Sequence, residues 1–410
     1  MQTRYLAFNE KFLFFLTVFA SFSIALSTAF MSLSMGFFVI IWAISLNYAK
    51  KFQLIRNNPA ALISVALFCL YGIGMIYSSA SWEIRLSWWL NYHKLLYIPM
   101  IVGILTIERY RRFALHAYLA GMLMVLLISY LKWMGIVPHT DIGQGYFVFK
   151  GRIAHNIFMA FTMYLLLRLS VQSSNLTRLT WILLSILAIF NIFFLVNGRT
   201  GQIITPILLG WFFWETWGFK SIKWIITAVI TMLVTFFTLS NFTNISGIRL
   251  AEIRQEILNH KPNEAPTSSG IRLEFYKNAL ELIKQNPVFG GGTGSFEVEY
   301  RLLVETKKTI STYVPNPHNE FLLTWQELGT VGLVMLLAFF AIQWRISYKI
   351  DSEEKEGNKM YGYALRGLII TILIGSLFNS LLLDAGEGKF YCVLAGVFLS
   401  AYQSKKQRIV

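Results

Sequence analysis

The chain has 410 residues, of which 55% are hydrophobic, 16% are aromatic and only 14% are charged. This composition excludes a disordered chain and is too apolar for an ordinary soluble domain. The formal net charge of +15 would favour nucleic acid binding in a soluble protein. No basic tract with interleaved aromatic residues stands outside the apolar runs, so basic loops at a membrane surface explain the charge better.

Long apolar runs predict an all-α, polytopic membrane protein with about twelve transmembrane helices. The expected spans lie near 12–27, 30–48, 60–79, 90–107, 113–134, 154–170, 179–197, 201–218, 223–241, 318–346, 365–384 and 388–403. They divide the chain into an N-terminal transmembrane bundle (1–241), a large loop (242–317) and a C-terminal group of transmembrane helices (318–410). The first run lacks a convincing cleavage site and is expected to remain as a span.

Basic residues concentrate in every second loop, from Lys50 and Lys51 to Arg345 and Lys349. This positive-inside pattern predicts that both termini are cytoplasmic and that loop 242–317 faces the periplasm. The two cysteines, Cys69 and Cys392, both lie inside apolar runs. They are expected to be buried small apolar side chains, not a disulfide or a metal-binding pair.

The loop 242–317 is too long for a plain connection and is expected to carry function. Apolar residues recur at helical spacing over 271–285, which predicts an amphipathic helix on the membrane face or over the outer mouth of the bundle. Asn286-Pro287 and the glycines of 290–294 end that helix. These glycines are expected to form a turn; the alternative is that their backbone N–H groups bind an anion.

His318 stands at the start of the next apolar run. Asn316 as cap and Pro317 in the first turn predict a helix that contains His318 in its first turn. The positive end of the helix dipole would then disfavour imidazolium and leave a neutral general base at the membrane surface. The plainer alternative is a polar residue that marks where the helix leaves the lipid. Glu320 is expected to stabilise the helix N-terminus through its charge.

Four stretches together resemble the O-antigen ligase superfamily, which includes lipopolysaccharide O-antigen ligases, Wzy-type polymerases and bacterial O-oligosaccharyltransferases. The stretches are His318-Asn319, nine residues, Gly329, two residues, Gly332; the turn Asn197-Gly198-Arg199-Thr200-Gly201; Arg272 with the following Asn286-Pro287-Val288-Phe289-Gly290-Gly291-Gly292; and Gly151-Arg152-Ile153-Ala154-His155-Asn156. The order of Arg199, Arg272 and His318 along the chain is also that of the family.

The resemblance implies a glycosyltransferase of the Gram-negative inner membrane with its active site on the periplasmic face. The donor would be a glycan on undecaprenyl diphosphate, and the acceptor a sugar hydroxyl of lipid A–core. Arg199 and Arg272 would bind the diphosphate, and His318 would activate the acceptor. Guanidinium groups suit this task because they bind phosphate oxygens in pairs and stay charged. Weaker candidates for substrate contact are Asn319, Arg152, His155 and Asn156.

Neither a metal nor a cofactor is expected, since arginines can take the place that Mg²⁺ holds in soluble glycosyltransferases. Inversion at the anomeric carbon is expected, because no carboxylate is evident that would form a glycosyl-enzyme intermediate. The arginines also have plainer interpretations: Arg199 as an interfacial anchor, and Arg272 as a solvated residue of an amphipathic helix.

Three other functions remain open. One is a Wzy-type polymerase that lengthens the lipid-linked glycan itself. Another is a protein O-oligosaccharyltransferase, although such members often carry a large extra C-terminal domain and this chain ends soon after its twelfth expected span. The third is a transporter of a lipid-linked or anionic solute. Transporters usually place ionisable groups at mid-membrane and often contain internal repeats, and the sequence shows neither.

Overall fold

The computed structural model of the protein describes residues 2–138, 145–221, 223, 268–307, 313–352 and 356–402. Their regular elements are helices, as expected, and the one extended pairing among them is the isolated bridge between Gly145 and Val196. The helices are α1 (Gln2–Leu26), α2 (Thr28–Ile44), α3 (Tyr48–Arg56), α4 (Pro59–Tyr77), α5 (Trp82–Asn91), η1 (His93–Leu96), α6 (Tyr97–Val102), α7 (Glu108–Trp133), α8 (Arg152–Gln172), α9 (Asn175–Phe190) with its π turn η2 (Asn191–Leu195), α10 (Arg199–Trp217), η3 (Gly218–Ser221), α13 (Ser268–Gln285), α14 (Ser295–Lys307), α15 (Glu320–Asp351), α16 (Glu356–Gly375) and α17 (Ala385–Leu399).

Six helical segments in the described part of the chain are long and apolar enough to cross a membrane. They belong to α1, α4, α7, α8, α9 with η2, and α15. The pair α2 and α3, bent by 115°, would make a seventh if it is one broken span. The expected total of about twelve spans therefore stays a prediction. The expected span 223–241 lies outside the described residues except for Lys223.

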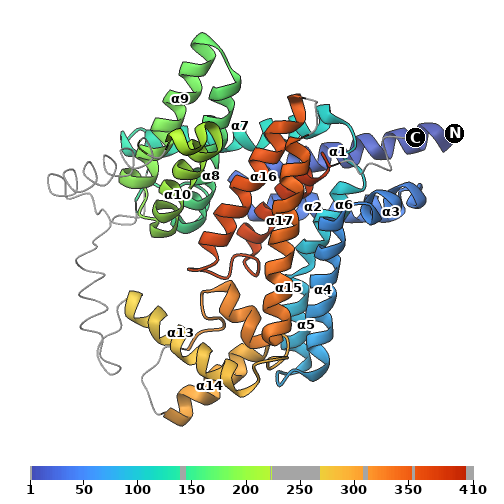
Figure 1. Ribbon diagram of the computed structural model, residues 1–410, viewed down its shortest axis with the longest axis vertical. Coiled ribbons are helices and arrows are strands. Elements are labelled where there is room, and N and C mark those ends of the chain that lie inside the picture. Colours follow the sequence, from blue (N-terminus) through green and yellow to red (C-terminus); the bar gives the residue numbers. More distant parts are fainter. Residues whose placement is uncertain are drawn as a thin grey trace.

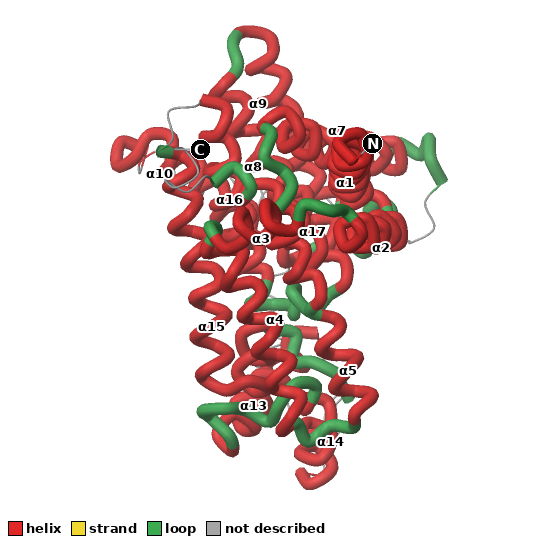
Figure 2. The backbone as a smooth tube through the Cα atoms, turned by 90° about the vertical axis from the view of Figure 1, so that its right-hand side faces the viewer, coloured by secondary structure: helices red, strands yellow, loops and turns green. Residues whose placement is uncertain are grey.

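Helix α15 packs against α4 and against α16 (Figure 1), and α17 is the most buried of the long helices. Both views place α13 and α14, the described helices of the long loop, together at one end of α15 and α4 (Figure 2). The predicted helix over 271–285 is confirmed by α13. Its apolar side chains Phe275, Ala279 and Leu282 pack into a small second core with Phe296 and Tyr300 of α14, so α13 has a buried face.

Three expected spans differ from the helices found. The run 90–107 is broken into α5, η1 and α6, and Pro99, which cannot donate a backbone hydrogen bond, lies in α6. The run 365–384 ends as a helix at Gly375, and 376–384 is irregular. The run 318–346 begins as α15 only at Glu320 and contains a non-helical residue, Gly329. The last two breaks both lie beside the site described below.

The surface of the helices carries many large apolar side chains, including Phe15, Ile76 and Leu176. Such exposure suits helices that face lipid, where apolar side chains lose nothing by contact with the surroundings. The prediction that both cysteines are buried is half wrong: Cys392 is buried, whereas Cys69 is exposed on α4, and neither forms a disulfide.

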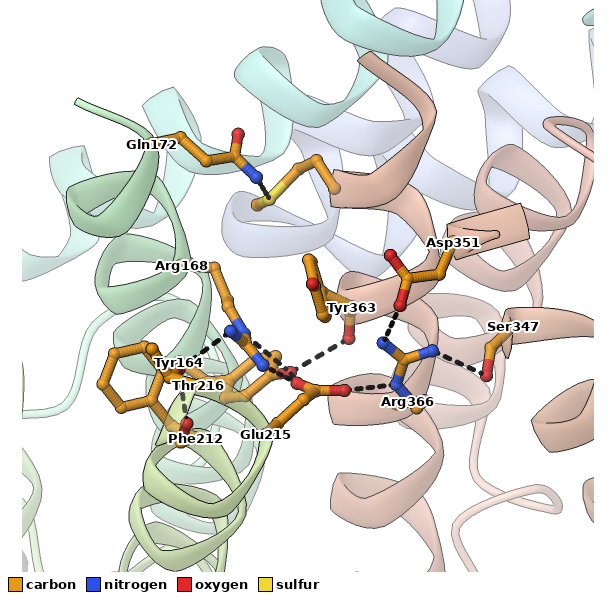
Figure 3. A network of polar contacts seen from close by, with 11 residues as sticks. Tyr164, Arg168, Gln172, Phe212, Glu215, Thr216, Ser347, Asp351, Tyr363 and Arg366 are labelled. Carbon is orange, nitrogen blue, oxygen red and sulfur yellow. Dashed lines mark hydrogen bonds and ion pairs between the residues drawn. The ribbon is translucent and has the colours of Figure 1, made fainter. Parts of the chain in front are cut away.

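A buried ion network joins four helices at one end of the bundle (Figure 3). Glu215 of α10 forms ion pairs with both Arg168 of α8 and Arg366 of α16. Arg366 also lies 3.3 Å from the carboxylate of Asp351 at the end of α15. The hydroxyl of Tyr164 donates to Glu215 at 2.8 Å. Because each buried charge has an opposite partner, the network fixes α8, α10, α15 and α16 to one another.

Candidate functional site

His318 lies just before α15, in the left-handed region of backbone conformation with φ of 52°. The prediction that Asn316 caps the helix and that His318 lies in its first turn is wrong. Asn319 is the cap: its Oδ1 accepts the N–H groups of Phe321 and Leu322, both at 3.0 Å. Asn316 Oδ1 instead accepts the N–H of His318 at 2.9 Å, which forms a tight turn before the helix.

The neutral state expected for His318 therefore needs another cause than the helix dipole. The side chain is half-buried, and burial lowers the pKa of His318 below its usual value. The positive charge of Arg272 lowers this pKa further. The ring packs against Phe275 of α13, with 6.0 Å between ring centroids. Both effects favour the uncharged form of the His318 imidazole.

The charge of Arg272 acts on His318, and the charges of two further arginines act on Arg272. Arg272 lies on α13, Arg199 opens α10 and Arg152 opens α8. Burial lowers the pKa of Arg272; Tyr276 opposes this shift, and the positive charges of Arg199 and Arg152 add to it. Arg272 therefore links His318 electrostatically to Arg199 and Arg152. These four basic residues were predicted from separate motifs.

His155 and Asn156 support the turn that precedes Arg199. The amide of Asn156 donates to the carbonyls of Ile192, Val196 and Gly198 at 3.0–3.2 Å. His155 accepts the N–H of Val148 at 3.3 Å and donates to Asn191 Oδ1 at 2.9 Å. Both side chains are buried and bonded to the protein, so their structural role is to hold the turn. Contact of either side chain with substrate stays a prediction.

The irregular segment 376–384 connects the turn of His318 to the turn of Arg199. The carbonyl of Leu377 accepts from Tyr276 Oη at 2.8 Å and from Asn319 Nδ2 at 3.1 Å. Ser380 donates to Asn316 Oδ1 at 3.1 Å. Asn379 donates to Thr200 Oγ1 at 3.3 Å. The segment is therefore a frame that spaces the arginines and the histidine.

Hydropathy alone concealed this frame, because 376–384 contains mostly leucine and phenylalanine. Gly375 followed by Ser376, Asn379 and Ser380 was the signal that could have revealed it. Asn319 has two roles in the same arrangement: its side-chain oxygen caps α15, and its side-chain N–H donates to the carbonyl of Leu377 in the frame. It thereby fixes the backbone that follows His318.

Glu320 fixes both ends of segment 376–384. Its N–H donates to the carbonyl of Ser376 at 2.9 Å. Its Oε2 accepts the N–H groups of Leu382 and Leu383 at 2.9 and 3.3 Å, and its Oε1 accepts Tyr92 Oη at 3.1 Å. The side chain is fully buried. The expectation that Glu320 acts only through its charge on the helix end therefore missed its main role.

The segment that follows α13 packs against the break of α15 at Gly329. At Gly329 φ is 63°, and a Cβ there would lie 2.1 Å from the carbonyl oxygen of Val288. Thr330 and Val331 donate to the carbonyls of Pro287 and Val288 at 2.9 and 3.3 Å. The spacing of Gly329 from His318 thus reflects a docking point for the loop.

The same contacts confirm the turn and exclude its alternative as an anion site. The N–H groups of Gly291 and Gly292 donate to the carbonyls of Gln326 and Glu327 at 2.8 and 2.7 Å. Those of Thr293 and Gly294 donate to the Gly74 carbonyl and to Glu327 Oε1 at 3.1 and 2.9 Å. These four donors are taken by the protein itself.

The fold and this cluster define a helical membrane protein with a cationic site at the ends of its helices. Residues 183–337 match a protein family described as O-antigen ligase. The matched segment contains Arg199, Arg272, His318 and Gly329. This match over residues 183–337 agrees with the resemblance to the O-antigen ligase superfamily found in the motifs.

One relative among known proteins is an uncharacterized protein of Haemophilus influenzae. The two chains are 25% identical over 248 residues, a stretch that covers 59% of this chain and 61% of the relative. The chain thus spans about three fifths of the length of that relative. The similarity shows relatedness and brings no activity with it.

Proposed function

We propose that the protein is an O-antigen ligase that transfers a glycan from undecaprenyl diphosphate to a sugar hydroxyl of lipid A–core. The family match supports a membrane glycosyltransferase of the ligase or polymerase type. The observation that carries the proposal is that Arg272 acts electrostatically on the half-buried His318 and is itself acted on by Arg199 and Arg152. Fixed cations beside a neutral base are what transfer from a sugar diphosphate requires.

On the donor side, the arginines act on the leaving group. As the bond between the anomeric carbon and the diphosphate oxygen breaks, its electron pair stays with the diphosphate, whose negative charge grows. Guanidinium groups held in place by a frame stabilise that charge more in the transition state than in the bound donor. In this proposal the arginines supply the charge that Mg²⁺ provides elsewhere, so transfer proceeds in a metal chelator.

On the acceptor side, His318 takes the proton of the attacking hydroxyl while its oxygen forms the new bond to the anomeric carbon. General base catalysis of this kind typically contributes about 10²–10⁴-fold. Attack from the face opposite the diphosphate inverts the anomeric carbon in a single step. The turn formed by Asn316 and Asn319 holds the imidazole on the same frame as the arginines.

A Wzy-type polymerase would use the same chemistry, with a second lipid-linked glycan as acceptor. The spacing of His318, Gly329 and Gly332, together with the large loop that carries α13 and α14, favours the ligase. The proposed location is the inner membrane of a Gram-negative bacterium. The basic loops support cytoplasmic termini and a periplasmic site there.

Transfer in detergent with EDTA tests the proposal directly. Purified protein, lipid-linked donor and lipid A–core should yield the ligated product, with an inverted linkage by NMR. His318→Ala should lower the rate by at least about 10²-fold, the usual range for a lost general base, while donor binding persists. Longer donor glycans without ligation would establish the polymerase instead. Equal rates in wild type and variant would remove His318 from the chemistry.

A further inference from the structure

A second polar cluster lies where α17 begins. Lys94 of η1, Lys150 of the segment before α8 and Lys389 of α17 are each at least nine-tenths buried. Asp384 and Glu387, at the start of α17, are half-buried beside them. These five residues, termed here the α17 cluster, come from three separate parts of the chain, and their side chains have been given no role above.

The charges of the α17 cluster are neighbours but form no ion pairs with one another. Lys150 Nζ donates to Thr28 Oγ1 at 2.6 Å, and Lys389 Nζ donates to Ser32 Oγ at 2.5 Å. Burial lowers the pKa of Lys150 to about 8, the charge of Glu387 opposes the shift and that of Lys389 adds to it. Within the described residues, neither of these two lysines has a carboxylate at ion-pair distance.

The hydrogen-bonding capacity of these groups is only partly used. An ammonium group has three donors, and Lys150 and Lys389 each place one on a hydroxyl of α2. Asp384 makes no side-chain cap bond to α17. A buried cation with so few partners is costly, so such a group is normally retained for a ligand or for a specific structural contact. The positively charged ammonium groups donate hydrogen bonds, and the negatively charged carboxylates accept them. Together they match vicinal hydroxyl groups of a sugar, which accept from ammonium and donate to carboxylate.

The α17 cluster is tied to the arginine–histidine site from two directions. Lys94 Nζ donates to the carbonyls of Leu383 and Asp384 at 2.7 and 2.8 Å, which is the far end of the frame 376–384. Lys150 precedes Arg152 by two residues. The cluster therefore adjoins both the far end of the segment 376–384 and the start of α8, which carries Arg152.

We propose that the α17 cluster is a glycan-binding subsite that holds hydroxyl groups of the acceptor sugars through Lys150, Lys389, Asp384 and Glu387. This proposal rests on the proposed function, because it assumes that an acceptor glycan approaches His318. The cluster positions the acceptor and takes no part in bond breaking.

Binding of core oligosaccharide released from lipid A tests the subsite without turnover. Saturation-transfer NMR or calorimetry on the purified full-length protein should show binding that weakens about tenfold or more in Lys150→Ala and in Lys389→Ala. Lys132→Ala is the matched control, since Lys132 donates to the carbonyl of Phe147 in the same segment as Lys150 and stands outside the cluster. The acceptor KM should rise by the same factor while kcat changes little.

Gly386→Leu is a second variant that keeps every charge. A Cβ at Gly386 would meet Thr28 Oγ1 at 3.7 Å and Lys150 Nζ at 3.8 Å, which are ordinary contacts, so the longer side chain covers the lysine without a backbone clash. It should weaken binding in the same way. Unchanged binding in folded lysine variants and in Gly386→Leu would overturn the subsite.

A rise in the donor KM alone would assign the cluster to the donor glycan and overturn the acceptor assignment. If wild-type protein binds the oligosaccharide through these lysines but ligates nothing, the subsite stands and the proposed function fails.

Discussion

Two neighbours set the proton affinity of His318: the apolar packing around its ring and the guanidinium of Arg272. Both lower the pKa of His318, so the base stays unprotonated through its ordinary titration range and loses activity only in more acidic solution. Transfer measured against pH should be level near pH 7 and should fall on the acidic side, below about pH 6.5.

Arg272→Gln separates the two causes. Removing the positive charge raises the pKa of His318, so the acidic fall in rate should move to higher pH, in addition to a lower maximum rate. Lys277→Gln, an exposed cation on the same helix, is the control and should leave the profile in place. If the rate of Arg272→Gln falls at the same acidic pH as that of the wild type, His318 is not the titrating base.

At the scale of the helices, the break of α15 at Gly329 decides where the long loop docks. Gly329→Ala puts a Cβ against the Val288 carbonyl in a backbone conformation that side chains rarely adopt. It should lower stability by about 1–3 kcal/mol or more, seen as a lower unfolding temperature in detergent.

Gly36→Ala is the matched control for that change, because a Cβ at Gly36 meets nothing within 4 Å and α2 is helical there. Alanine should leave its stability unchanged or slightly raised. Equal unfolding temperatures for the two variants would show that the loop does not depend on the break. A selective loss of activity in Gly329→Ala at low temperature would place the effect at His318, eleven residues away along the chain.

The sequence predicted helices better than it predicted their ends. Periodicity found α13, because its buried face repeats at helical spacing. The start of α15 was misplaced, since Asn316 and Asn319 are both good caps and only tertiary bonds to Leu377 and Ser380 decide between them. The frame 376–384 was missed for a related reason: its apolar letters satisfy a hydropathy window, while its backbone is held by Glu320 from another helix.

The sequence allowed each candidate residue to be identified, but it did not predict how these residues are arranged in space. Arg199, Arg272 and His318 stand in motifs that a resemblance can detect. Their electrostatic connection depends on how α13 is placed relative to α8 and α10, which no single motif encodes. The motif also did not reveal the structural role of its polar residues: Asn156 bonds the turn before Arg199, and His155 bonds Asn191.

Across the whole molecule, the ion network and the site occupy opposite ends of the same helices. Arg152 and Arg168 are separated on α8, and Arg199 and Glu215 on α10, by about 24 Å at 1.5 Å per residue. Glu215→Gln would leave Arg168 and Arg366 buried without their shared carboxylate. Loss of a buried partner costs about 3–5 kcal/mol, so the unfolding temperature should fall markedly.

Glu108→Gln is the comparison for that loss. Glu108 pairs with Arg112 on an exposed helix face, where an ion pair contributes about 0–1 kcal/mol. The unfolding temperature of Glu108→Gln should match that of the wild type. If Glu215→Gln were equally mild, the four helices would be held by apolar packing alone, and the network in Figure 3 would be incidental to their alignment.

The position of the frame also has a consequence for biosynthesis. Arg152, Arg199, Arg272 and His318 emerge from the ribosome in that order, and 376–384 follows all of them. Until that segment is inserted, Asn316, Asn319, Thr200 and the carboxylate of Glu320 lack the partners that space them. A nascent chain therefore carries all four proposed site residues before the hydrogen bonds that position their segments can form, and the site we propose is complete only after α16 and α17 are inserted.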